Sequence, residues 1–172
     1  MSFKKNNFFS FKIKKWRELD WFYVQVKKQL LIIIGITEAK HDVLVIKQYR
    51  PPFDDYVISF PMGAFEIKKD RSEMTDIAKK EAEEETGFEI KRIFPIIDFA
   101  RSCGLTDEIA TTYLAYYGEE QGKQYLHENE DIEVIRIPIN SFRKEILSMI
   151  KDGFIIDSSI LIMMNLSLKD FS

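Results

Sequence analysis

The order of extended and helical segments is the feature that most constrains how this chain can fold. Apolar, β-branched and aromatic residues predict two strands within 21–36 and further strands at 43–48, 56–60, 88–99, 109–117 and 132–139. Helices are expected at 72–86, 141–151 and 157–168. Because strands, helix, strands and two helices follow one another without regular βαβ alternation, a mixed α/β sandwich is expected.

Local signals predict where several of these elements begin and end. Ser72 is the expected N-cap of the first helix, and Gly87 is its expected C′ residue. Residues 62–71 and 118–129 are expected to be loops. At the N-terminus, lysines are interleaved with phenylalanines, which favours either a mobile tail or an edge strand protected by charge.

The composition excludes several classes of protein. The chain has 172 residues, 45% of them hydrophobic, which is enough for one domain with a real core. Its formal net charge of -3 provides no positive field for nucleic acid. The longest apolar run, 30–36, is about a third of a membrane-spanning length, so no membrane partner is expected. A single cysteine favours a reducing, cytoplasmic location.

The strongest chemical signal is the run Lys80-Glu81-Ala82-Glu83-Glu84-Glu85-Thr86-Gly87. On a helix, Glu81, Glu84 and Glu85 share one face near the negative end of the dipole, where like charges repel. Glu83 points away from this shared face. One interpretation is a solvated acidic face. The other is a site for a hard divalent cation, Mg²⁺ or Mn²⁺, whose charge would cancel the repulsion.

This run and its flanks resemble the Nudix box, G-x5-E-x7-R-E-U-x-E-E-x-G-U, in which U is an aliphatic or aromatic residue. Residues 80–88 match its second half, with Lys80 in place of the arginine. The first half departs from the pattern, because Gly63 lies three residues too far from the second glycine. The first glutamate of the box then falls on Lys69 or Ser72. In the family this glutamate mainly braces the loop, so the departure concerns the loop more than metal binding.

Three further segments resemble the ADP-ribose pyrophosphatases of the Nudix hydrolase family. They are the strand end and box entry (47–52 and 60–63), the run Ser102-Cys103-Gly104-Leu105-Thr106-Asp107-Glu108, and residues 130–135. Cys103 replaces a proline of that branch. Together the resemblance covers about residues 20–168.

The resemblance implies an α/β fold of the α+β type, an α/β/α sandwich with a mixed β-sheet. It also implies an Mg²⁺-dependent pyrophosphohydrolase that cleaves a nucleoside diphosphate sugar, with ADP-ribose giving AMP and ribose 5-phosphate. Mn²⁺ is a possible substitute. The alternatives are the same chemistry on another nucleotide sugar or a dinucleotide, and a Nudix-fold module that binds a nucleotide without cutting it.

Site residues follow from the resemblance by motif position. The implied metal ligands are the backbone carbonyl of Met62 and the side chains of Glu81, Glu84 and Glu85. Glu130 is the implied loop carboxylate that positions or deprotonates water, and Glu128 is its close rival. Arg50 would contact the substrate, and Trp21 or Trp16 would stack on its base. Ordinary solvated or core roles remain the alternatives for Glu130, Arg50 and the tryptophans.

The same resemblance bears on assembly. Residues 1–172 are expected to form one Nudix-like domain, in which residues 1–20 are a mobile or dimer-contacting segment. Similar enzymes are commonly homodimers that exchange N-terminal strands, so a homodimer is expected. The expected small-molecule partner is a nucleoside diphosphate derivative.

Overall fold

The protein is described by a computed structural model that covers residues 8–66 and 70–165. The N-terminal strands are β1 (Phe9–Trp16) and β2 (Leu19–Val26). The remaining strands are β3 (Lys28–Thr37), β4 (Asp42–Arg50), β5 (Asp55–Ser59), β6 (Met62–Glu66), β7 (Phe88–Ala100), β8 (Ile109–Gln121), β9 (Ile132–Pro138) and β10 (Ile155–Ile156). The helices are α1 (Arg71–Thr86), α2 (Phe142–Lys151) and α3 (Ser158–Met163).

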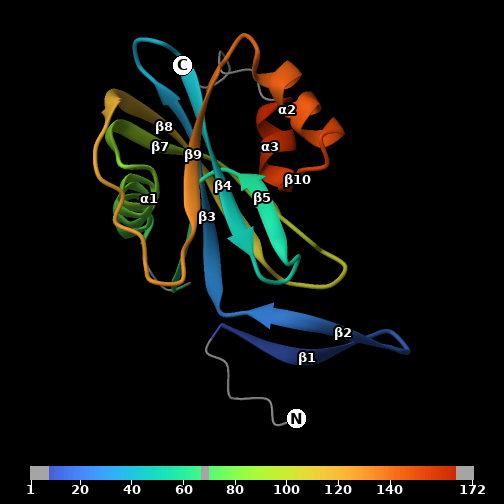
Figure 1. Ribbon diagram of the computed structural model, residues 1–172. Coiled ribbons are helices and arrows are strands. Elements are labelled where there is room, and N and C mark those ends of the chain that lie inside the picture. The colour runs from blue at the N-terminus through green and yellow to red at the C-terminus, as the bar shows by residue number, and fades with distance from the viewer. Residues whose placement is uncertain (1–7, 67–69, 166–172) are drawn as a thin grey trace.

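The main sheet is mixed and divides into two arms. Its strand order is β10-β5-β4-β3-β8-β7, with β6 beside β3 and β9 beside β4. β3 and β4 pair only near Gly35 and Ile36 and then diverge, so that β6 lines the lower part of β3 and β5 lines that of β4 (Figure 1). The segment that joins β5 to β6 therefore crosses the opening between the two arms.

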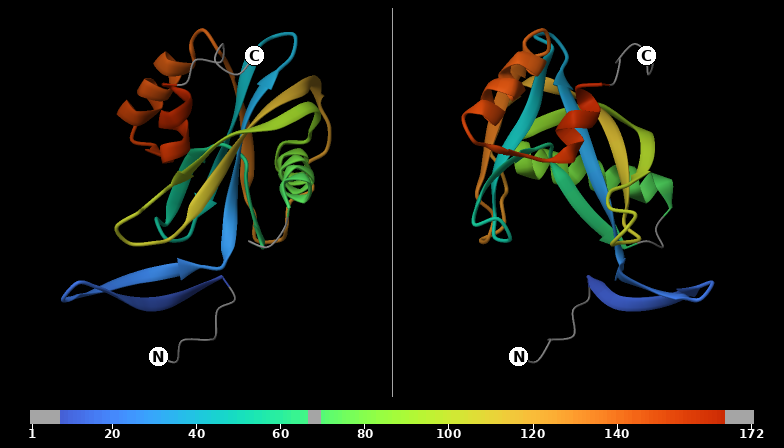
Figure 2. Two further views of the ribbon diagram at one scale, coloured as in Figure 1. Left: turned by 180° about the vertical axis from the view of Figure 1, so that it is seen from behind. Right: turned by 90° about the vertical axis from the view of Figure 1, so that its right-hand side faces the viewer.

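Helices cover both faces of this sheet, which confirms the expected α/β/α sandwich. Figure 2 shows α2 and α3 on one side of the sheet and α1 on the other. Phe142 and Ile146 of α2 pack into one buried cluster with β3, β4 and β5. Ala78 and Ala82 of α1 pack into a second cluster with β3, β7 and β8. The small alanine side chains allow α1 to lie close to the sheet.

β1 and β2 form a hairpin that projects from the body of the protein (Figures 1 and 2). Of the two sequence-based alternatives for the N-terminus, the edge strand is therefore confirmed for the described residues, while Lys4 and Lys5 lie outside them. The hairpin touches the body mainly through Val24, which pairs with Thr106 and accepts the N–H of Asp107. Its large apolar side chains stay in solvent; Phe11 is 70% exposed.

Most expected elements are confirmed, but four expectations were wrong: one strand was expected to be a loop, and three ends of elements were misplaced. Residues 62–66 form β6 rather than a loop, because β3 offers an open edge and Phe65 becomes buried against it. The N-cap of α1 is Asp70, whose carboxylate accepts the N–H of Glu73 at 2.8 Å, and not Ser72.

The other two differences concern a loop and a helix. The loop expected from residue 118 begins only after Gln121, because β8 continues to pair with β7 as far as Phe88. The last helix ends at Met163, and the predicted residues 166–168 lie outside the described part of the chain. No helix in the described ranges is long and apolar enough to cross a membrane.

Candidate active site

Both ends of α1 are fixed by specific residues, and these fix the position of its acidic C-terminal end. Asp70 caps its first turn, and Gly87 ends it in the left-handed conformation (φ 74°), as the sequence predicted. A side chain at Gly87 would meet the backbone oxygen of Gly122 at 2.7 Å, so the loop after β8 lies directly against this glycine. Both ends of the helix are thereby determined, and so is the face on which its carboxylates lie.

Glu85 is the buried centre of the site. Its side chain is only 5% exposed, and its Oε2 accepts the backbone N–H of Met62 at 3.1 Å. Burial raises the pKa of Glu85 to about 8, and the charges of Glu130 and Glu81 add to the rise. The Met62 N–H and the charge of Arg50 oppose it. A carboxyl held in this way retains its proton at neutral pH unless a cation replaces that proton.

Glu81 lies beside Glu85 on the half-buried edge of the same face. Burial, followed by the charge of Glu84 and then that of Glu130, raises the pKa of Glu81 above its ordinary value, while Lys80 and His127 act against the rise. A Cβ atom at Gly63 would lie 2.7 Å from the Cγ atom of Glu81. The first box glycine is therefore required for space, because β6 passes directly over this carboxylate.

The remaining two glutamates of the run have different neighbours. Glu84 forms an i,i+4 ion pair with Lys80 at 3.6 Å. Glu83 turns to the other side, where its Oε1 accepts the N–H of Ile90 at 2.8 Å and lies 3.9 Å from the Lys79 ammonium. The prediction that Glu83 points elsewhere is confirmed, and its role is to fasten the start of β7 to the helix.

The structure distinguishes the two loop glutamates. Glu130 is half-buried, and its charge acts on both Glu81 and Glu85. Its Oε2 accepts the N–H of His127 at 2.9 Å, which closes a tight turn. Glu128 is exposed and is not among the main influences on either raised pKa. Its charge thus connects Glu130, rather than Glu128, with the acidic face of α1.

Arg50 reaches the site from the opposite arm of the sheet. It is half-buried at the end of β4, and its charge lowers the pKa of Glu85. Gln48 lies two residues earlier on the same face of the strand. Its side chain is 7% exposed, and its amide oxygen is buried without a hydrogen-bond partner among the described residues. The sequence signal for Gln48 was a polar residue inside an apolar strand, and no role was predicted for it.

The two tryptophans lie elsewhere. Trp16 and Trp21 share one face of the hairpin and line a hollow of about 680 Å³ against residues 100–109. None of the carboxylates described above lines this hollow, and neither does Arg50. Within one chain, the structure does not bring the tryptophans and the acidic helix into one cavity.

The donor chemistry of the acidic face suits a hard cation, since every available donor is an oxygen. As the side chains stand in residues 8–66 and 70–165, however, no three acidic, histidine or cysteine groups are close enough together to hold a metal ion. The ion pair with Lys80 engages Glu84, and the Met62 N–H engages Glu85. The electrostatic repulsion between these carboxylates is what a cation would relieve.

No family model matches the chain, but comparison with known proteins finds relatives of similar sequence. A methanol dehydrogenase activator of Bacillus methanolicus is 32% identical over 131 residues, 76% of this chain and 66% of that protein. An ADP-ribose pyrophosphatase of Bacillus subtilis is 32% identical over 116 residues, 65% of this chain and 59% of the relative. An uncharacterised Nudix hydrolase of Schizosaccharomyces pombe is 30% identical over 133 residues, 74% and 63% of the two chains.

The proteins to which this chain is similar thus include an ADP-ribose pyrophosphatase and a Nudix hydrolase. The chain belongs to the Nudix hydrolase family. It spans somewhat under two thirds of the length of these relatives.

Proposed function

We propose that this protein is a divalent-cation-dependent pyrophosphohydrolase that cuts the diphosphate of a nucleoside diphosphate sugar. ADP-ribose, split into AMP and ribose 5-phosphate, is the expected substrate. The observation that carries the proposal is Glu85, a buried carboxyl within reach of the charges of Glu81, Glu130 and Arg50. Similarity to an ADP-ribose pyrophosphatase supports the choice of substrate class.

The cation site is proposed to consist of Glu81, Glu84, Glu85 and the backbone carbonyl of Met62. Two raised pKa values on one helix face support this set, because both carboxyls would be stabilised in the ionised form by a nearby positive charge. Mg²⁺ is expected, with Mn²⁺ as a substitute; either ion would neutralise phosphate oxygens and lower the pKa of a bound water.

The remaining steps are assigned to side chains of this chain. Glu130 is proposed to accept a proton from the attacking water, since it is the loop carboxylate that acts on the helix face. Arg50 is proposed to bind a phosphate of the substrate through its planar guanidinium. No ion pair of Arg50 occurs among the described residues, which leaves this group available to an anion.

We also propose that the active form is a homodimer in which the hairpin contacts the partner. Its exposed apolar side chains support this: they are Phe9, Phe11, Ile13, Trp16, Leu19, Trp21 and Phe22. Trp16 or Trp21 would then stack on the base in the partner's site. Phe11→Glu should lower the sedimentation coefficient, whereas Tyr125→Glu, at an exposed aromatic residue outside the hairpin, should not. A monomeric wild type would contradict the proposal.

A substrate panel tests the function directly. The protein is incubated with Mg²⁺ and ADP-ribose, another nucleotide sugar or a dinucleotide, and the products are separated by chromatography. AMP and ribose 5-phosphate are expected from ADP-ribose. Turnover of another compound alone would support the same chemistry on a different substrate, and binding without turnover would support a nucleotide-binding module.

A matched pair of variants tests the assignment of the base. Glu130→Gln should lower kcat by about a hundredfold or more, because a general base is removed. Glu128→Gln, an exposed position two residues away, should leave kcat within about twofold. The reverse ranking would transfer the role to Glu128.

A further inference from the structure

The loop that follows β8 is fastened to the C-terminal end of α1. The last carbonyl groups of a helix have no partner within it and must find donors elsewhere. Three donors reach this end of the helix: Gln121 Nε2, at the end of β8, donates to Thr86 O (3.0 Å), and in the loop Gly122 N donates to Gly87 O (2.7 Å) and Tyr125 N to Glu84 O (2.9 Å). The loop and the acidic end of the helix therefore form one hydrogen-bonded unit.

Gln124 makes a different connection, because its side chain joins two elements. Its Nε2 atom donates to the backbone oxygen of Glu85 at 2.6 Å and to that of Ile132 at 3.3 Å. Both acceptors are carbonyl oxygens, so the amide nitrogen, which carries two protons, has to face them. One half-buried side chain thus bridges the helix at Glu85 and the first residue of β9.

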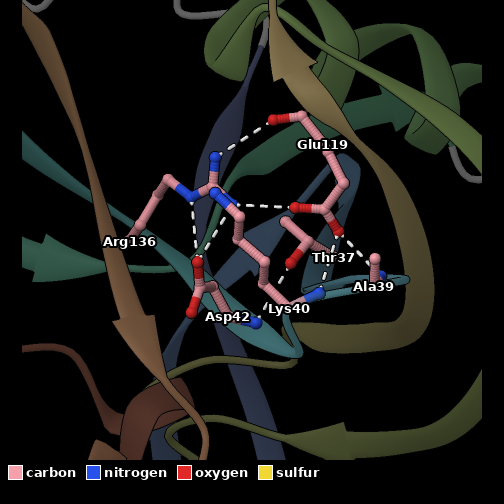
Figure 3. Close-up of polar contacts among 6 residues, drawn as sticks. All are labelled: Thr37, Ala39, Lys40, Asp42, Glu119 and Arg136. Carbon is pink, nitrogen blue, oxygen red and sulfur yellow. Dashed lines mark hydrogen bonds and ion pairs between the residues drawn. The ribbon is translucent and has the colours of Figure 1, made fainter.

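The position of this bridge matters because Glu130 lies in the segment that it closes. That segment begins after Gln124 and ends at Ile132. At its base, β8 and β9 are already held together: Arg136 binds Glu119 and also Asp42 (Figure 3). The hydrogen bond between Glu130 and His127 is internal to the loop and cannot fix the loop to the helix.

We infer that Gln124 is a positioning residue that holds Glu130 at a fixed place relative to the acidic face of α1. The inference rests on the proposed function, in which Glu130 and Glu85 act on one substrate. Without the bridge, the loop keeps its own turn, its base, the Tyr125 N–H bond to Glu84 O and the bonds that Asp131 accepts from Tyr49 N–H and Tyr56 O–H. It loses the side-chain bond that joins Glu85 directly to Ile132. A carboxylate displaced by about 1 Å from its reacting water loses up to about a hundredfold in rate.

The test compares Gln124→Met with Gln121→Met. Methionine keeps the length and flexibility of glutamine but donates no hydrogen bond. Both variants lose a side-chain bond to the end of α1, and only Gln124→Met also loses the bond to β9. Gln124→Met should lower kcat by about tenfold to a hundredfold with KM within about threefold, while Gln121→Met stays within about threefold in both. Equal losses in the two variants would overturn the inference.

A double-mutant cycle separates positioning from general destabilisation. In a Glu130→Gln background, Gln124→Met should lower kcat by less than about twofold, because the group that it positions is already absent. A full additional loss would show that Gln124 does not act through Glu130.

If the wild type turns over no nucleotide, the proposed function fails. Hydrogen exchange then still tests the inference, because it measures the order of the loop and not activity. Backbone amides of 126–131 should exchange at least about tenfold faster in Gln124→Met than in Gln121→Met, with no difference in 142–151. Unchanged exchange in 126–131 would overturn the inference whatever the activity.

Discussion

Replacing Glu85 by glutamine should remove a strong pH dependence from the stability of the metal-free protein. The folded state keeps the Glu85 proton up to about pH 8, since burial raises its pKa from the ordinary 4.5. The unfolded chain releases that proton near its ordinary value. Between these two values the unfolded state binds fewer protons, so the free energy of unfolding falls as the pH rises.

The magnitude follows from the two pKa values. Proton linkage converts the rise from 4.5 to about 8 into a loss of about 3 kcal/mol of unfolding free energy between about pH 5.5 and pH 8. Glu81 acts in the same direction, because its pKa is also raised. The lowered pKa values of Glu89 and Glu119 affect stability only at more acidic pH, below this window.

The assay is urea unfolding in EDTA at several values between about pH 5.5 and pH 8, for the wild type and for Glu85→Gln. The wild type should lose stability across the range, and the variant should lose much less because it has no proton to release. Mg²⁺ should restore the wild type at high pH and leave the variant unchanged. Parallel pH profiles for the two proteins would refute the assignment of a raised pKa to Glu85.

Three further substitutions test the packing around the site. Gly87→Ala should destabilise the protein by about 1–3 kcal/mol in urea unfolding, because of its positive φ and the contact with the loop backbone, whereas Gly104→Ala, with open space around it, should be near neutral. Gly63→Ala should lower kcat with only a small change in the melting temperature, since the added methyl group displaces Glu81. Arg136→Lys should cost about 1–3 kcal/mol in thermal unfolding, because lysine cannot bind two carboxylates and a carbonyl in one fork.

Much of the fold was predictable because its signals are local. The apolar segments of β2, β3, β4, β8 and β9 and the glycine at the end of α1 are read from neighbouring residues. β6 was not predictable in this way, since its strand conformation depends on the free edge of β3. The N-cap was misassigned because Asp70 and Ser72 are both good capping residues and only the actual path of the chain selects between them.

By itself, the sequence determined the chemistry available to this protein: a helix with Glu81, Glu84 and Glu85 on one face, and its resemblance to the Nudix box. Only the tertiary structure decided how those groups differ. Burial makes Glu85 the carboxyl with the strongly raised pKa, and the folding of one loop brings Glu130 rather than Glu128 to the helix. The reason is physical: repetition along a helix is a property of neighbouring residues, whereas desolvation and charge coupling arise from segments that meet only in the folded chain.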